Sequence, residues 1–378
     1  MINDVTTTEE AKKLPYGLGI FATAPKMEQT FSENSVRYEY ENVAGIRISP
    51  WIAGQARNDD IISEQLIGLK FADEYFAKSF ANVGGGLVII AEQGSETSFE
   101  LSTIIEKSGS DIIFIIAEEN SVLRVFETLK TENVMISNVP DGGTTPVRRP
   151  VFFGRNIFVS VGRGASVTFA GTAEIPTGSS YFSYKSSRVL ENGKMEWYGL
   201  HSGADMIRSV TEDILAGKGA ESYVHDLSLC SGENFDMYNT TRHEADNTAS
   251  HIFARGIAGG GGKIVYRALS DIKEGIVGAT GRQDGRFLIA SSGAEIDAIP
   301  SLDIGSSESN SSHALSISHL RDSDYFYPAL RGIAPYHAQA MLLSGFLSKL
   351  LENLPPKRQT AFLEPINKKL SSPMYRFD

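Results

Sequence analysis

Histidines are the residues of this sequence whose side chains could most directly bind a metal. His243 and His251 lie close together in the chain, and His313 and His319 form a second pair with even spacing, which keeps both on one face of a strand. Imidazole is a common metal ligand, but most histidines are surface or hydrogen-bonded structural residues. No cysteine or tight group of His, Asp and Glu completes a metal site around any of the four.

A glycine-rich segment from Gly256 to Lys263 superficially matches a phosphate-binding loop. The Walker pattern requires glycine where Ile257 stands and Ser or Thr where Ile264 stands. We therefore expect this segment to be a turn between two strands, and we expect no ATP binding by this chain.

Cys230 is the only cysteine, so the chain has no internal disulfide and no cysteine-rich cluster site of its own. Its neighbours Leu227 and Leu229 indicate a buried and unreactive thiol, because apolar surroundings raise a thiol pKa. A reducing cytoplasm is the simplest setting for such a chain.

The elements that would position these residues are clearest in the last quarter of the chain. From Glu295 to Ile304, apolar residues such as Ile296 and Ala298 alternate with polar ones such as Asp297, as in a half-buried strand. Pro300 cannot donate a hydrogen bond, so we expect this strand at a bend or an edge. Farther on, Pro335 and Pro355 bound a helical pattern, whose apolar positions at helical spacing are Leu343, Phe346, Leu347, Leu350, Leu351 and Leu354.

Before that, short β-rich runs dominate from Gly84 onward, and a helix is expected only at Ile61 to Phe80. The runs are Leu87–Ile90, Asp111–Ile116, Asn133–Ile136 and Asn156–Val161. Gly-Ala pairs begin at Gly164, Gly219 and Gly293, with separations close to multiples of eighteen to nineteen residues. Small residues at regular intervals are typical of the tight corners of a β-helix, whereas a β-sandwich is the alternative.

The amino-acid composition and net charge indicate which kinds of partner are unfavourable. The chain has 378 residues, 41% of them hydrophobic, and 35 basic against 46 acidic residues give a net charge of -11. No basic run exceeds a pair, which disfavours nucleic acid and anionic membranes as partners. No stretch approaches the roughly 20 apolar residues of a membrane span, and the run from Leu14 to Ala24 is too short and too broken for a secretion signal.

From Thr241 to Gly345, the order of motifs resembles the SufB/SufD family, the scaffold subunits of the SUF iron–sulfur cluster assembly system. No single motif is diagnostic, but their combined order is specific. They are Arg242-His243, Asn247–Ser250, Ala254–Ile257, Gly262–Leu269, the strand at 295–304, His313, Phe326-Tyr327, Arg331-Gly332 and Ser344–Phe346.

The resemblance implies a mainly β fold, a right-handed parallel β-helix at residues 84–322. A small α+β region would precede it at residues 1–83, and a helical region would follow at residues 323–378. It implies a cytoplasmic scaffold rather than an enzyme, which handles iron or an iron–sulfur cluster transiently. The implied partners are a SufC-type ABC ATPase and either a SufB-like subunit or a second copy of this chain.

Within that family, His313 matches the histidine of a Ser-His-Gly-Ala element in SufD-type sequences, which implies a metal ligand. Gly285 stands where SufB-type sequences carry a sulfur-accepting cysteine, and Ala314 stands where they carry a glutamate. Glycine can neither accept sulfur nor bind iron, so the resemblance implies a chain that is SufD-like in its chemistry or a divergent archaeal or bacterial member of the family.

Two interfaces are also predicted. We expect the strands Phe287–Ala290 and Ile296–Ile304 to form an edge that pairs with a second subunit. The helix from Pro335, whose Leu343/Phe346/Leu350 face would cover the end of the β-helix, would dock the ATPase through its remaining apolar surface. The residues expected to bind the partner are Phe326, Tyr327, Arg331, Gly332, Ala338, Met341 and Leu342.

Two other functions remain open on the residues alone. Polysaccharide lyases and hydrolases also use β-helices, and Asp205, Glu212 and Asp213 could serve as their acid and base. Those enzymes are typically exported, which this sequence does not favour. An interaction module without a metal is the other alternative.

Overall fold

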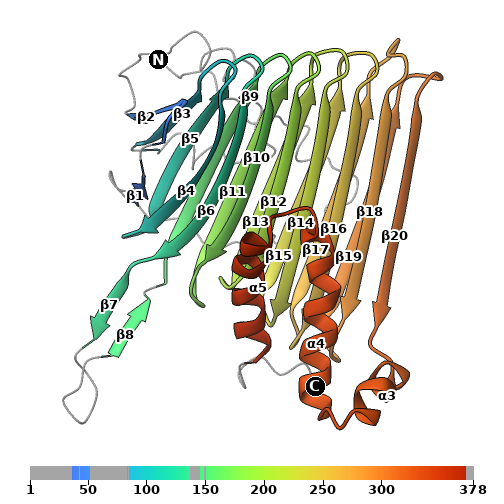
Figure 1. Cartoon of the computed structure of the whole chain (residues 1–378). Helices are drawn as coiled ribbons and strands as arrows, with labels where there is room; N and C mark the ends of the chain where they lie inside the picture. The colour runs from blue at the N-terminus through green and yellow to red at the C-terminus, as the bar shows by residue number, and fades with distance from the viewer. Residues whose placement is uncertain are drawn as a thin grey trace.

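Two long β-sheets, stacked face to face, form most of the molecule. The computed structural model describes residues 36–41, 43–51, 83, 85–136, 145–148 and 150–371. Sheet A has the strand order β1-β4-β6-β10-β12-β14-β16-β18-β20, and sheet B has the order β19-β17-β15-β13-β11-β9-β5-β3-β2. The chain alternates between the sheets from β3 onward, and almost all neighbouring strands are parallel (Figure 1). This confirms the predicted parallel β-helix.

The strands are mostly nine to eleven residues long and follow one another with short turns. Those of sheet A are β1 (Val36–Tyr40), β4 (Glu96–Ile105), β6 (Val122–Thr131), β10 (Ser166–Glu174), β12 (Lys194–Ser202), β14 (Glu221–Ser231), β16 (Ala249–Gly259), β18 (Thr280–Ile289) and β20 (Asn310–His319). Those of sheet B are β2 (Ile46–Trp51), β3 (Gly86–Ala91), β5 (Gly109–Ala117), β9 (Phe152–Val161), β11 (Ser180–Val189), β13 (Met206–Leu215), β15 (Asn234–His243), β17 (Lys263–Ile272) and β19 (Glu295–Ile304). A separate hairpin, β7 (Asn133–Ile136) and β8 (Thr145–Arg148), interrupts the coil. The four β-rich runs of the sequence therefore lie in strands, as predicted.

The predicted repeat of eighteen to nineteen residues is wrong. Ser166 pairs with Lys194 and Lys194 pairs with Glu221, so successive coils take 28 and 27 residues. Gly164 and Gly219 precede β10 and β14 of sheet A, two coils apart, whereas Gly293 precedes β19 of sheet B. The three Gly-Ala pairs therefore mix two different corners, and their spacing suggested a period that the fold does not have.

The corners nevertheless require small residues, as expected. Gly164 and Gly219 have φ values of 63° and 71°, and a Cβ at either position would lie 2.4 Å from the side-chain oxygen of Asn120 or Asn192. Only glycine combines this backbone conformation with so close a neighbour. Between the corners, side chains of alternate residues point inward and form one continuous core, with Trp197, Phe153 and Phe235 fully buried.

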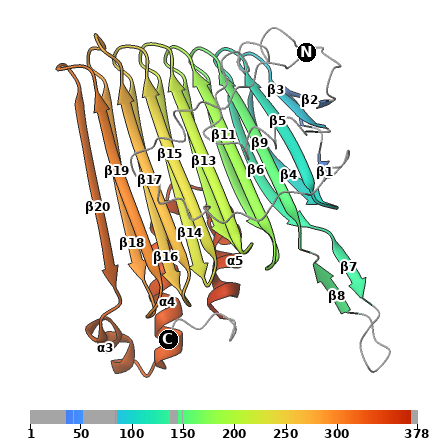
Figure 2. The same cartoon turned by 180° about the vertical axis from the view of Figure 1, so that it is seen from behind.

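The two ends of the β-helix differ. At the N-terminal end, β1 and β2 pair antiparallel with β4 and β3. At the other end β19 and β20 are the outermost strands, and no strand in the described part of the chain pairs with their outer edges (Figure 2). The predicted edge is correct for Ile296–Ile304 and wrong for Phe287–Ala290, because β20 pairs with β18 and covers it.

C-terminal helices cover the outer face of sheet A (Figure 1). They are α4 (Pro335–Ser348), the 3-10 turn η3 (Lys349–Leu351) and α5 (Pro356–Leu370), whereas α3 (Asp322–Leu330) lies beyond the end of β20 and packs against α4. The predicted start at Pro335 is confirmed, and Leu343, Leu347 and Leu351 are buried against sheet A. The helix therefore covers a face of the β-helix rather than its end.

Two other predictions fall on the N-terminal segments. The expected helix at Ile61 to Phe80 and the run from Leu14 to Ala24 lie outside the described residues. Among the residues that are described, every helix is too short or too polar to cross a membrane.

Candidate functional site

His313 lies on β20, at the open end of the β-helix. It pairs in register with Gln283 of β18, and it shares the inward-facing parity of Leu315, which packs against the core. The His313 side chain is exposed because no further coil follows. Gln283 is buried and donates to Ser270 at 3.0 Å and to the Ser301 carbonyl at 2.8 Å. His313 is therefore accessible to solvent, and it lies next to the buried hydrogen bonds that Gln283 makes inside the last coil.

His313 would need metal ligands from elsewhere. His319 shares its face, as predicted, but six residues of extended strand separate the two by about 20 Å, too far to bind one metal ion. Within the described ranges, no group of three or more His, Cys, Asp or Glu side chains is arranged to hold a metal. The assignment of His313 as a ligand thus stays a prediction that depends on a partner.

The other two histidines have structural surroundings. His243 is buried, with Nδ1 2.8 Å from Thr248 Oγ1 and Nε2 2.9 Å from Ser250 Oγ, and burial lowers its pKa to about 4. His251 stacks on Phe253 with ring centroids 3.6 Å apart, and burial lowers its pKa to about 4 as well. Both rings are therefore neutral at pH 7, and the contacts of His243 and His251 account for them without a metal.

Gly285 lies inside the open end, one strand away from β20. It pairs with Leu315, and a Cβ at this position would lie 3.2 Å from Phe287 and 3.3 Å from Leu315. The side chain of Ala314 points to the opposite face, away from the interior. A cysteine at position 285 would have to displace these apolar neighbours. The packing of the interior at this position therefore favours glycine.

The glycine-rich segment and Cys230, the other candidates from the sequence, have structural roles. Gly260 and Gly261 form the turn between β16 and β17 with positive φ, and Lys263 is held by Glu295 at 2.7 Å and by Asp297 at 3.1 Å. Cys230 is buried, and burial raises its pKa to about 12. The predictions of a strand-connecting turn and of a buried thiol are confirmed.

The candidate acid and base of a carbohydrate enzyme do not face each other. Asp213 points into the core and accepts hydrogen bonds from Ser187, Ser222 and Trp197. Glu212 points to the outer face of sheet B, where it accepts a hydrogen bond from Tyr184 at 2.9 Å. Adjacent residues of one strand on opposite faces cannot flank one glycosidic bond.

A group of exposed apolar side chains lies on α3 and α4. Phe326, Tyr327, Leu330 and Met341 are each at least 60% exposed. Arg331, directly after α3, donates to the Tyr327 hydroxyl at 2.7 Å, and its guanidinium lies over the Tyr327 ring. We call these five residues the α3–α4 patch. Large exposed side chains on two helices that pack together are typical of an interaction surface.

Two residues expected in that surface lie elsewhere. Ala338 is only 1% exposed and belongs to the buried side of α4, so its prediction as a contact residue is wrong. A small residue there lets α4 approach its neighbours closely. Leu342 is half-buried, and Gly332 ends the turn after α3 with a φ of 72°. The exposed surface of α4 is therefore narrower than the sequence suggested.

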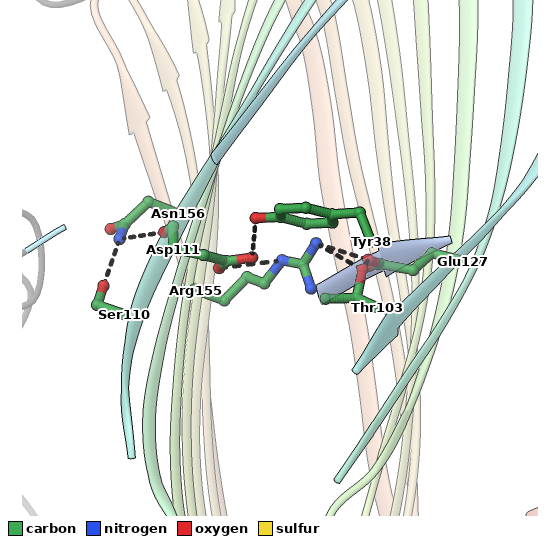
Figure 3. Close-up of polar contacts among 7 residues, drawn as sticks. All are labelled: Tyr38, Thr103, Ser110, Asp111, Glu127, Arg155 and Asn156. Carbon is green, nitrogen blue, oxygen red and sulfur yellow. Dashed lines mark hydrogen bonds and ion pairs between the residues drawn. The ribbon is translucent and has the colours of Figure 1, made fainter. Parts of the chain in front are cut away.

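At the N-terminal end, the interior of the β-helix contains a charged cluster that the sequence did not reveal (Figure 3). The Arg155 guanidinium lies 2.6 Å from Glu127 and 3.5 Å from Asp111, and all three side chains are buried. Tyr38 of β1 donates to Asp111 at 2.8 Å, and Thr103 donates to Glu127 at 2.6 Å. Burial raises the pKa of Asp111 to about 6 despite the nearby arginine.

Residues 104–346, more than half of the chain, match the family described as SUF system FeS cluster assembly, SufBD core domain. Iron-sulfur cluster assembly SufBD family proteins of Staphylococcus aureus strains USA300 and N315 are each 27% identical over 172 residues, and one of Staphylococcus epidermidis is 28% identical. Each alignment covers 45% of this chain and 37% of the relative, so the match spans little more than a third of those proteins.

Proposed function

This chain belongs to the SufBD family, and on that premise we propose that it is a scaffold subunit for iron–sulfur cluster assembly, with a SufD-like role. One observation carries the proposal. The β-helix ends in two uncovered strands, β19 and β20, and the side chain of His313 is exposed on the last of them. An uncovered strand is a ready template for pairing with another chain.

The partner at this end would be a SufB-like subunit or a second copy of this chain. Ile304 and Ile317 are exposed apolar residues on the two edge strands, which fits an interface. Imidazole suits ferrous iron, but one histidine binds weakly unless thiolate or carboxylate ligands join it. With Cys230 buried and glycine at position 285, the chain offers no accessible thiol in its described part. The partner would therefore supply the remaining ligands of iron or of a transient cluster.

A matched pair of variants tests the role of His313. His313→Ala and His319→Ala each remove an exposed imidazole from the same face of β20. We expect the complex purified from cells to lose most of its iron and acid-labile sulfide with His313→Ala, and to keep both with His319→Ala. Iron and sulfide retained in both variants would show that His313 is not a ligand, and a wild-type complex without iron or sulfide would favour a metal-free interaction module.

The α3–α4 patch would bind a SufC-type ABC ATPase, and the chain would work with it in the cytoplasm. The patch is apolar, exposed and close to the open end, so an ATPase bound there could act on the subunit interface by favouring one of two arrangements. Co-purification of such an ATPase is the direct test. Met341→Glu should abolish it, because a charge would be buried without a partner, whereas Thr360→Glu on an exposed part of α5 should not.

A further inference from the structure

We propose that the interior of the β-helix holds a binding site for a halide-sized monovalent anion at Lys185. The Lys185 side chain enters a cavity of about 40 Å³ between the two sheets, which Tyr181, Ser183 and His201 also line. It is 8% exposed. It forms no hydrogen bond and no ion pair with any residue that the structure describes.

The fold holds Lys185 inside, because β11 carries its polar residues inward. Ser183, Lys185 and Ser187 are buried on the inner face of sheet B, whereas Phe182 and Tyr184 belong to an apolar cluster on its outer face. A shift of β11 by one residue would exchange the two faces and is prevented by its pairing with β9 and β13 on both sides. The ammonium group therefore cannot turn to solvent.

Two glycines on the opposite sheet create the space. Gly171 of β10 and Gly199 of β12 are register neighbours, and both face the cavity. A Cβ at Gly199 would lie 3.4 Å from Lys185 Nζ, 3.6 Å from His201 Nε2 and 3.7 Å from Asp226 Oδ1. An ammonium, an imidazole and a carboxylate thus surround a gap that a single methyl group would partly fill.

The carboxylates near Lys185 already have partners. Asp226 Oδ1 lies 2.8 Å from His201 Nε2 without the geometry of a hydrogen bond, and Asp226 Oδ2 accepts a hydrogen bond from Asn239 at 2.7 Å. Glu127, which also lines the cavity, is paired with Arg155. Asp213 accepts hydrogen bonds from three donors. Burial lowers the pKa of Lys185, although Asp226 and Asp213 oppose this effect from a distance.

The Lys185 ammonium is buried without a hydrogen-bond or ion-pair partner in the described chain, and its Nζ lies 5.7 Å from the centroid of the Trp197 ring. A ligand of opposite charge would stabilise it. The cavity has room for about two or three water-sized groups, which admits a halide-sized ion and excludes a polyatomic metabolite. The site would hold the anion between Lys185 Nζ and the ring of His201.

Bromide tests the proposal directly. Crystals of the full chain soaked in sodium bromide and measured at the bromine absorption edge should show an anomalous peak within hydrogen-bonding distance of Lys185 Nζ. Sodium bromide should also raise the melting temperature more than sodium gluconate of equal ionic strength, because gluconate is too large for the cavity. Water alone in the cavity, with no anomalous signal, would overturn the proposal.

Gly199→Ala is the sharpest variant, because its Cβ would make only ordinary van der Waals contacts and the chain should fold. It should remove the bromide peak and the bromide-specific stabilisation, as should Lys185→Met. Gly345→Ala, with open space around its position in α4, should retain both. A bromide effect that persists in Gly199→Ala would overturn the proposal even where Lys185→Met does not fold.

Discussion

The strands at the two ends of the β-helix differ in their direction relative to the coil. At the N-terminal end, β1 and β2 run antiparallel to the strands that they cover, and Tyr38 reaches from β1 to the buried charges of Asp111 and Arg155. At the C-terminal end, β19 and β20 keep the parallel direction of the coil, and their outer edges are not paired within the described chain. Each end leaves outer edges without a partner strand in the described chain, but only the C-terminal end keeps the direction of the coil, so that a further parallel strand can be added to each sheet there.

This difference indicates at which end of the β-helix a partner would bind. Antiparallel strands interrupt the repeat at the N-terminal end, and the bond from Tyr38 to Asp111 ties β1 to the charged cluster, so we expect a partner to extend the coil at the C-terminal end. The open end exposes apolar side chains, including Ile304 and Ile317, beside His313. We therefore expect changes at the closed end to affect the stability of the chain and changes at the open end to affect association.

The largest expected effect is at the closed end. Arg155→Met would leave Asp111 and Glu127 buried without their cation, and we expect unfolding free energy to fall by about 3–5 kcal/mol in urea denaturation. Arg163→Met is the control, because Arg163 is 70% exposed and lies 4.0 Å from its acidic neighbour. The control should change stability by less than about 0.5 kcal/mol. Similar losses in both variants would contradict a stabilising role for the cluster.

Between the two ends, His243 should make stability depend on pH. Its pKa is about 4 in the folded chain and about 6.5 when unfolded, so the unfolded state binds an additional proton between these values. Stability should therefore fall by up to about 3 kcal/mol as the pH drops from 7.5 through this range to 4. His243→Gln should flatten the profile measured by urea denaturation, and His319→Gln should not. An unchanged slope in His243→Gln would show that other groups cause the acid sensitivity.

A charged residue introduced at the open end should weaken association with the partner and leave the fold of the chain unchanged. Ile317→Lys places an ammonium on the inward side of the edge strand, and we expect about 2 kcal/mol of lost binding, roughly 30-fold in affinity, by sedimentation velocity. Ser318→Lys changes the neighbouring residue, which points to the other face, and should have little effect. Equal effects of the two variants would mean that the inner edge is not the contact.

The smallest expected effect again concerns the closed end. Tyr38→Phe removes the hydroxyl that donates to Asp111, which should cost about 1 kcal/mol of stability. Tyr40→Phe, on the same face of β1, is the control. If thermal denaturation gives both variants the wild-type stability, β1 is held by backbone pairing alone.

The sequence revealed elements whose signals are local. Pro335 begins α4 as predicted, and the alternation from Ile296 to Ala298 places both residues in the core. Local patterns suffice there because a strand or helix with one buried face repeats every two or three to four residues.

The interior charges could not be found in this way. Asp111, Glu127 and Arg155 come from three strands, and stacking of successive coils brings these strands together. The number of residues in one coil could not be predicted from the sequence, so the meeting of these side chains could not be predicted either. The assignment of Ala338 failed for a related reason. An alanine on a helix is compatible with either face, and only the packing of α4 on the sheet shows which face is buried.

Hydrogen–deuterium exchange of β20 tests the central claim most directly. The amides of Asn310–His319 that point away from β18 should exchange rapidly in the chain alone, diluted until it is monomeric, and should be protected in the complex purified from cells. The amides of β1 should exchange at the same rates in both samples, because the partner would bind at the other end of the β-helix. Fast exchange of β20 in the complex would contradict the account, since it would leave the open end without a partner.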